Sequence, residues 1–235
     1  MGKHVFLSVL AGTLLALVAG VYLMSFKDPH ASHAGYPWQI EQLASGHTRV
    51  FSLTIGQSTL GDAEKLFKGI AEITLFAAPE SVSPRPEPVI EAFFSEVNIG
   101  GLKSKMVLTL DLPADEIETM MNRGARIATL GSGIRKVTLS SEDASRAREF
   151  AIASITYLPS INLSAELIEK RFGEPAEKIA DTESDGIHWL YPEQGIDIAI
   201  SEENKEVFQY VLPAKFTALV APLKLEKVSA EKIKE

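Results

Sequence analysis

Two stretches of the chain, about a hundred residues apart, share a pattern of helix end and glycine. Residues 62–72 read DAEKLFKGIAE and residues 167–178 read LIEKRFGEPAEK. In both, an amphipathic segment runs into a glycine, which is typical of a helix that ends there. Strand-like segments follow each stretch and lead to the same tripeptide, Leu-Pro-Ala, at 112–114 and 212–214. Such a recurrence indicates a duplicated structural unit, so we expect two tandem units of one topology.

The first unit is expected at residues 47–114, in the order strand, helix and three strands. Val50 to Thr54 alternates apolar and polar residues, which predicts a strand. Ser58 or Thr59 can cap the helix, Thr59 and Asp62 have the spacing of a capping box, and Gly69 ends the helix. The three strands are predicted at 72–76, 90–97 and 105–111.

The second unit is expected at residues 155–214 in the same order. Ser164 can cap its helix, and Leu163 with Ile168 has the spacing of a hydrophobic staple. Gly173 lies where this helix must end. An opening strand at 155–158 precedes the helix, and three short strands follow it at 188–191, 196–201 and 207–212.

These patterns predict an α+β protein with antiparallel sheets and a membrane-anchored N-terminus. We expect a cytoplasmic N-terminus at 1–4, a transmembrane anchor at 5–24, a tether at 25–46, the first unit at 47–114, a connecting segment at 115–154, the second unit at 155–214, and a C-terminal helix with a charged tail at 215–235. Within the connecting segment the pattern predicts helices at 115–123 and about 141–154 and a strand at 134–139.

The segment from Val5 to Met24 contains twenty residues without a charge, long enough to cross a bilayer as a helix. Lys3 precedes it, whereas Asp28 offsets Lys27 after it, and this bias favours a cytoplasmic N-terminus. In a bacterium the chain would then be a single-pass inner-membrane protein with its C-terminal domain in the periplasm. A cleavable signal, cut after Ala34, is the alternative.

Charge and cysteine content exclude several kinds of partner and chemistry. The chain carries 23 Lys and Arg against 31 Asp and Glu, and two of the lysines lie within the first 27 residues. An acidic domain argues against nucleic acid and anionic lipid headgroups, which need clustered basic residues. The absence of cysteine excludes a lipoprotein anchor, disulfides, thiolate zinc sites and cysteine nucleophiles.

The second unit carries a recognisable motif. Leu163, Phe172-Gly173-x-Pro175 and Gly186-x-x-Trp189-x-Tyr191, followed by an alternating strand, resemble the SmpA/OmlA family over roughly residues 160–213. That family supplies the BamE-type subunit of outer-membrane β-barrel assembly, and its helix-then-meander architecture recurs in tandem in the β-lactamase-inhibitor-protein fold. The resemblance implies this fold and an envelope setting. Residues 47–114 lack the motif, and the chain has no cysteine for a lipoprotein anchor.

Trp189 and Tyr191 are the candidate partner-binding residues. They lie two apart on one predicted strand, so they share a face. Aromatic side chains are over-represented in binding hot spots, and they also dominate protein cores. Packing against the helix of their own unit is the favoured interpretation, and contact with a partner is the alternative.

No pattern predicts a catalytic residue, a metal ligand or a bound cofactor. His30 and His33 with Asp28 lack a third ligand at structured spacing, and residues 181–185 (DTESD) lack the glycine and final glutamate of a calcium loop. We expect His188 to be a partly buried, hydrogen-bonded histidine. The sequence contains no HExxH, Walker or dinucleotide motif.

The sequence therefore favours a non-enzymatic binding or scaffold module that engages another envelope protein through a sheet face or edge. A lipid or small-molecule carrier is the alternative, and it would need an apolar groove between the units, lined for example by Phe93, Met106 and Phe208. A hydrolase would need His188 or His47 beside a carboxylate and a serine in one cleft. The identity of the partner or ligand is not encoded in any motif.

Overall fold

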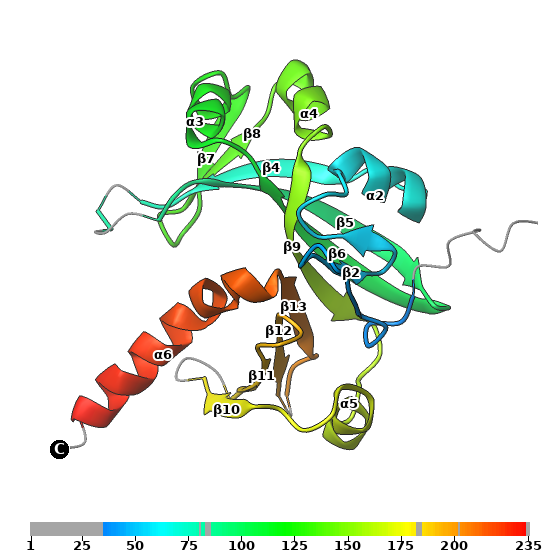
Figure 1. Cartoon of the computed structure of the whole chain (residues 1–235). Helices are drawn as coiled ribbons and strands as arrows, with labels where there is room; N and C mark the ends of the chain where they lie inside the picture. The colour runs from blue at the N-terminus through cyan, green and yellow to red at the C-terminus, as the bar shows by residue number, and fades with distance from the viewer. Residues whose placement is uncertain (1–34, 80, 83–85, 182–184, 202, 234–235) are drawn as a thin grey trace, which may run out of the picture. The chain divides into compact units, whose positions relative to one another are not determined.

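The computed structural model describes residues 35–79, 81–82, 86–181, 185–201 and 203–233. Residues 34–235 form one compact unit. It consists of a large antiparallel sheet with helices packed on it, which confirms the predicted α+β class (Figure 1). Of the helices in the described part of the chain, none combines the length and apolarity that a membrane span needs. The anchor predicted at Val5 to Met24 lies outside the described residues.

The main sheet contains ten strands in the order β10-β11-β12-β13-β9-β6-β5-β4-β8-β7, and every neighbouring pair is antiparallel. The strands are β4 (Glu72–Ala77), β5 (Val89–Ile99), β6 (Leu102–Asp111), β7 (Arg126–Thr129), β8 (Arg135–Thr138), β9 (Ala151–Pro159), β10 (Glu177–Ala180), β11 (Ile187–Tyr191), β12 (Ile196–Ile200) and β13 (Val207–Val211). Short turns connect β5 to β6 and β11 to β12.

Strand β9 joins the two halves of this sheet, because it pairs with β6 on one side and β13 on the other. The boundary expected between residues 154 and 155 therefore falls inside a central strand. The prediction of a helix to about residue 154 is wrong, because α4 (Ser141–Ala147) ends seven residues earlier. Residues 151–154 belong to β9, whose backbone groups form hydrogen bonds with β6 and β13. These bonds to distant strands stabilise the extended form and override the local helical pattern.

The prediction of two tandem units with one topology is wrong, because the two halves differ in the number of strands that follow the helix. Three strands (β4, β5 and β6) follow α2 (Leu60–Phe67), whereas four (β10, β11, β12 and β13) follow α5 (Ala165–Phe172). The sequence analysis missed β10 and β7, which are four residues long and lie at the two edges of the sheet. Short edge strands carry weak alternation, so the pattern gave little signal for them.

The segment Val50 to Thr54 is not the continuous strand that was predicted. A two-residue turn within it joins β2 (Thr48–Val50) to β3 (Leu53–Thr54) as a hairpin. Together with β1 (Glu41–Gln42) these strands form a separate three-stranded sheet. Phe51 and Ser52 occupy the turn with φ of 53° and 63°. Positive φ at both central positions is the geometry of a tight hairpin, which glycine and asparagine usually occupy.

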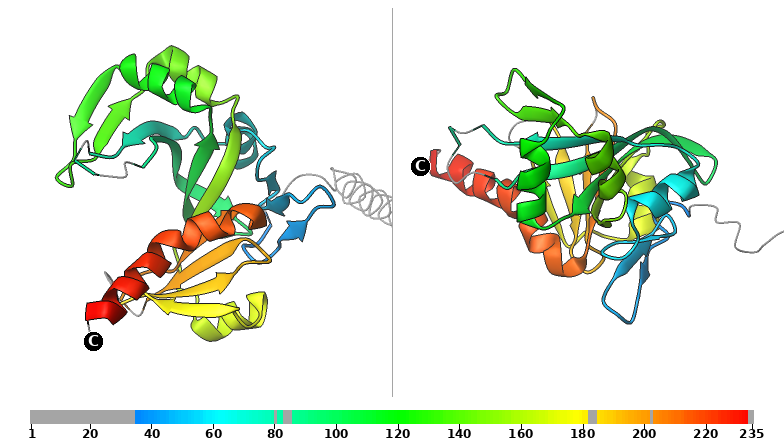
Figure 2. Two further views of the ribbon diagram at one scale, coloured as in Figure 1. Left: turned by 60° about the vertical axis from the view of Figure 1, so that its left-hand side comes forward. Right: turned by 90° about the horizontal axis from the view of Figure 1, so that it is seen from above.

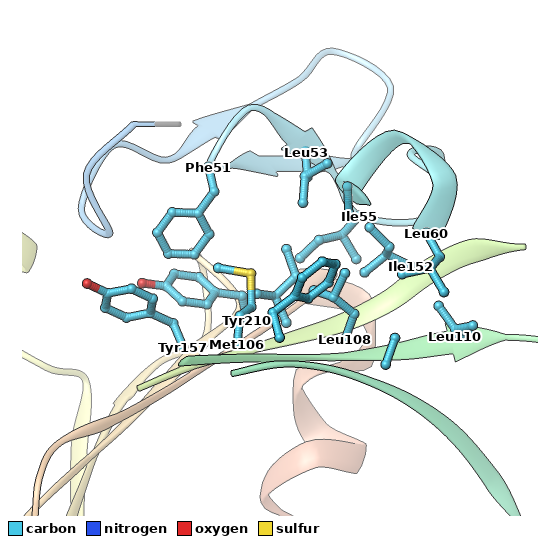
Figure 3. Packing of buried hydrophobic residues seen from close by; sticks show 14 of the residues in the cluster. Phe51, Leu53, Ile55, Leu60, Met106, Leu108, Leu110, Ile152, Tyr157 and Tyr210 are labelled. Atoms are coloured by element: carbon cyan, nitrogen blue, oxygen red, sulfur yellow. The ribbon is translucent and has the colours of Figure 1, made fainter. Parts of the chain in front are cut away.

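Burial of the Phe51 ring explains why a phenylalanine occupies this turn. The ring is fully buried, and its centroid lies 5.1 Å from that of Tyr157 and 5.4 Å from that of Tyr210 (Figure 3). The hairpin thus closes over the main sheet and carries Leu53 with it into the core. The free energy gained by burying the aromatic ring offsets the cost of a positive φ.

Local capping signals place the helix starts where the sequence predicts them. Thr59 and Asp62 form the expected capping box at α2, and Ser164 accepts a hydrogen bond from the Leu167 amide at the start of α5. The end of α2 differs, because Lys68 and not Gly69 takes the left-handed C-cap position. The connecting helix α3 (Ala114–Asn122) lacks a side-chain cap.

Helices α2 to α5 contribute to one continuous core, since buried residues of all four belong to the same cluster as Met106, Tyr157 and Phe208. Helix α6 (Phe216–Ile233) lies on the opposite face of the second half (Figure 2). A smaller apolar cluster joins this helix to the strands through Phe216, Val220 and Leu190. The second half of the sheet is therefore covered on both faces.

Part of the predicted tether is folded. Tyr36 stacks on Trp38 with ring centroids 5.0 Å apart, and Trp38 packs against the core. The buried Tyr210 hydroxyl donates a hydrogen bond of 3.0 Å to the Pro37 carbonyl. Residues 35–46 of the predicted tether thus belong to the folded domain, because these contacts fix the segment to it.

Candidate binding groove

A groove of about 690 Å³ opens in the second half of the protein, at the start of α5. The turns before β11 and after β12 form its other walls. The described residues that line it are Asn162, Leu163, Ser164, Ala165, Asp185, Ile187, Trp189, Ile200, Ser201, Glu203 and Glu206. Its volume falls in the range of sites that hold a small molecule or a few side chains of a partner.

Strand register determines the floor of the groove. Ile187 of β11 pairs with Ile200 of β12, and the next pair on the same face is Trp189 with Ile198. Alternation along β13 places Glu206 on the face of Phe208 and Tyr210, both of which are fully buried. The groove therefore combines an apolar floor with the side chain of Glu206.

Glu206 is only 5% exposed, although it lies in a turn between two strands. The next residue back, Lys205, donates a hydrogen bond to the Ser160 carbonyl, which fastens this turn to the end of β9. The Oε2 atom of Glu206 is buried and has no hydrogen-bond partner among the described residues. A buried carboxyl oxygen without a partner is costly, so this atom is a candidate contact for a ligand.

The other two buried acids of the described chain have partners. Asp143 accepts hydrogen bonds from Arg123 at 2.5 Å and from the Ser140 hydroxyl at 2.8 Å. Asp197 lies 2.8 Å from Nδ1 of His188. Of these three carboxyl groups, Glu206 alone keeps an oxygen unpaired within the described residues, and it alone lines the groove.

The groove is acidic. Asp185, Glu203 and Glu206 line it, and no Lys, Arg or His is among its described lining residues. The start of α5 also borders it, but the Ser164 hydroxyl already caps the Leu167 amide at 3.3 Å. A hydrogen bond with Ser164 also lowers the pKa of Glu166, with help from the backbone of Glu166 itself. The helix terminus is therefore occupied by its own cap, and the charged residues among the described lining are all carboxylates.

Trp189 and Tyr191 take different places although they share a strand. Trp189 is 6% exposed and lines the groove, and the Lys178 Nζ lies 3.8 Å from its ring centroid. Tyr191 is 4% exposed and packs on Phe172. The favoured interpretation of core packing thus describes Tyr191 well, and Trp189 reaches both the core and the groove. Contact of either residue with a partner stays a prediction.

The Tyr191 hydroxyl links β11 to the end of α5. It donates a hydrogen bond of 3.0 Å to the Gly173 carbonyl. Burial, with a smaller contribution from Glu169, raises the pKa of Tyr191 to about 12. This tyrosine therefore stays neutral at physiological pH and acts as a structural hydrogen-bond donor.

His188 is buried and hydrogen-bonded, as the sequence predicts, and its partner is Asp197. One condition for a hydrolase, a carboxylate beside this histidine, is thus present. His188 lies on the face of β11 opposite to Trp189, however, and neither His188 nor Asp197 lines the groove. The other candidate, His47, is half-buried, and its Nδ1 lies 3.1 Å from the Ser45 hydroxyl.

The apolar cleft suggested for a carrier is not where the sequence analysis placed it. Met106 and Phe208 are fully buried members of the filled core, and Phe93 lies on the opposite face of the sheet. Among the described residues, no cluster of three His, Asp or Glu side chains could hold a metal ion. His30, His33 and most of the 181–185 loop lie outside the described residues.

Sequence reasoning missed Glu206. The strands predicted at 196–201 and 207–212 leave Glu206 in the turn between them, where a glutamate is ordinarily solvated. One signal was present: counting back from Tyr210 through Phe208 in steps of two places Glu206 on the inward face. The groove itself had no local signal, since its walls come from three separate segments.

Comparison with known proteins adds little to this geometry. No family model and no curated protein matches the chain. Among solved structures, a DUF4309 family protein (YjgB) from Bacillus subtilis is similar over 71% of this chain and 88% of its own, with 13% identity and a TM-score of 0.35. A likeness of this size supports no inference about fold or function.

Proposed function

We propose that the chain is a non-enzymatic binding module that engages another envelope protein at the groove beside Trp189. The observation that carries the proposal is an open groove with an apolar floor that contains a buried, unpaired carboxyl oxygen of Glu206. Evolved binding sites combine such a floor with a few placed polar groups. The second half thus presents a concave surface into which side chains of a partner fit.

The envelope setting of this proposal rests on the sequence alone. The uncharged segment Val5 to Met24 would anchor the chain in the inner membrane, and residues 35–233 would then lie in the periplasm. Another membrane or periplasmic protein is the expected partner. The resemblance of residues 160–213 to the SmpA/OmlA family supports the same setting.

Site-specific photo-cross-linking of the full-length chain in its native membranes tests the proposal. A photoreactive residue at Ile187, which lines the groove and is 44% exposed, should give a defined cross-linked partner. The matched control is Ile127 on β7, which is 55% exposed and lies outside the groove. Ala165→Trp should abolish the product from position 187, because the added ring fills the groove.

Two results would contradict the proposal. Position 187 could give no product, or both positions could give the same products with no effect of Ala165→Trp. Mass spectrometry of the isolated product identifies the partner. Circular dichroism of Ala165→Trp must show an intact fold for its effect to count.

A further inference from the structure

We propose that the groove binds the cationic side chain of a lysine or arginine from the partner protein, with Glu206 as its counter-ion. This inference rests on the proposed function, because it specifies the chemistry of the partner at the same site. Three observations support it: the burial of Glu206, the charge of the residues that line the groove, and the apolar surface of its floor.

One carboxyl oxygen of Glu206 lacks a hydrogen bond within the described residues. Oε2 of Glu206 has no partner in the described chain, whereas the buried acids Asp143 and Asp197 are each satisfied. A carboxylate only accepts hydrogen bonds, so its missing partner must be a donor. A cationic donor is favoured, because charge-assisted hydrogen bonds are stronger than neutral ones.

The charged side chains that line the groove are negative. Asp185 and Glu203 also line the groove, and its described lining contains no basic residue. Three carboxylates near a low-dielectric floor attract a positive charge and repel a negative one. A metal ion is not the expected cation, since no described cluster of three acids or histidines has the geometry to hold one.

The uncharged part of the lining is largely apolar. Leu163, Ile187, Trp189 and Ile200 give the groove an apolar lining beside Glu206. Lysine and arginine have an aliphatic stem that packs on apolar surface while the charged end reaches a polar partner. The contact of Lys178 with the Trp189 ring at 3.8 Å shows that this indole accepts a cation on its face.

The test uses hexylammonium as a probe of a cation on an aliphatic stem, with hexanoate and hexanol as the anionic and neutral probes of equal length. The chain has two tryptophans, so Trp38→Phe leaves Trp189 as the one fluorescent reporter in the full-length protein. Hexylammonium should change the Trp189 fluorescence in a saturable manner, and hexanoate should not. Equal responses to all three probes would overturn the inference.

Glu206→Gln is the decisive variant, because it keeps the shape of the side chain and removes its charge. The affinity for hexylammonium should fall by about tenfold or more, as expected when a buried charged hydrogen bond is lost. Glu203→Gln is the matched control, since Glu203 is exposed at the rim, and it should weaken binding by less than about threefold. Unchanged affinity in Glu206→Gln would overturn the inference.

Cross-linking from position 187 separates this inference from the proposed function. If Glu206→Gln and saturating hexylammonium both remove the cross-linked partner, the partner supplies the cation. If the partner persists under both conditions, the proposed function stands and the cationic contact is wrong. If hexylammonium binds but position 187 gives no partner, the protein source of the cation is wrong together with the proposed function.

Discussion

The two halves of the sheet begin alike and close differently. Each has a side-chain-capped helix followed by antiparallel strands, α2 before β4 in the first half and α5 before β10 in the second. In the first half the chain before the helix leaves the main sheet and forms the β2–β3 hairpin, which places Phe51 over the core. In the second half the chain before the helix is β9, which stays in the sheet.

This difference decides which part of the sheet stays uncovered. The hairpin packs on the central strands β9 and β13 through the contacts of Phe51 with Tyr157 and Tyr210, whereas the groove opens at the start of α5 and has no hairpin residue in its described lining. Helix-then-strands order is a local property, but closure of a face depends on where the preceding segment goes. Two halves that share a capped helix followed by antiparallel strands can therefore differ in which part of the sheet stays open.

The largest expected effect comes from removing the buried Phe51 ring of the hairpin. Phe51→Ala should lower the free energy of unfolding by about 3–5 kcal/mol, as for other buried phenylalanines. Urea unfolding of the full-length chain measures it. Ile70→Ala, at a position 82% exposed, is the control and should change stability by no more than about 0.5 kcal/mol. A loss below about 1 kcal/mol for Phe51→Ala would contradict the role of this ring in holding the hairpin on the sheet.

The buried acids should respond in opposite ways to loss of charge. Asp197→Asn removes the charged hydrogen bond to His188 and should cost about 1.5–3 kcal/mol. Glu206→Gln, without ligand, should be neutral or stabilising, because it removes a buried charge that lacks a full set of partners. Denaturant unfolding of both variants makes the comparison, and equal destabilisation would show that Glu206 is satisfied within the chain.

The helix ends offer a matched pair of substitutions. Gly173, at the end of α5, has φ 86° and ψ −174°, a region that only glycine populates freely, so Gly173→Ala should cost about 1–3 kcal/mol. Lys68, at the end of α2, has φ 54°, and Lys68→Gly should stabilise by about 0.5–1 kcal/mol. Both positions are exposed, so thermal unfolding reports backbone strain alone. Shifts of the same sign would contradict this explanation.

At neutral pH the smallest difference is expected for Tyr191, whose contribution to stability changes only at high pH. Its pKa is raised to about 12 in the folded chain, and an unfolded tyrosine titrates near pH 10. Above about pH 10 the unfolded chain loses this proton first, so the free energy of unfolding should fall with pH by up to about 1.4 kcal/mol per unit until about pH 12. Below pH 10 this contribution is fully present.

Tyr191→Phe isolates this contribution. Unfolding measurements at about pH 9, 10 and 11 should show a shallower decline in the variant than in the parent chain. A second difference is expected at neutral pH, where loss of the hydrogen bond to Gly173 should cost about 0.5–1.5 kcal/mol. Parallel pH profiles would contradict the assignment.

Local patterns in the sequence were sufficient for much of the fold. The capping box of Thr59 and Asp62, the cap at Ser164 and the helix end at Gly173 lie where they were predicted. The long alternating strands β5 and β6 were also found. These features depend on hydrogen bonds and periodicity within a few residues of one another, so the sequence encodes them directly.

The sequence by itself determined the caps that start α2 and α5, the longer strands and the acidic, cysteine-free character of the chain. Only the tertiary structure decided that β9 joins both halves, that Phe51 turns back into the core, and that Glu206 is buried in the lining of a groove. Each of these depends on segments far apart in the chain. Burial of a residue depends on which helices and strands pack against it. Favourable packing can override a local preference for a helix, a strand or a solvated turn.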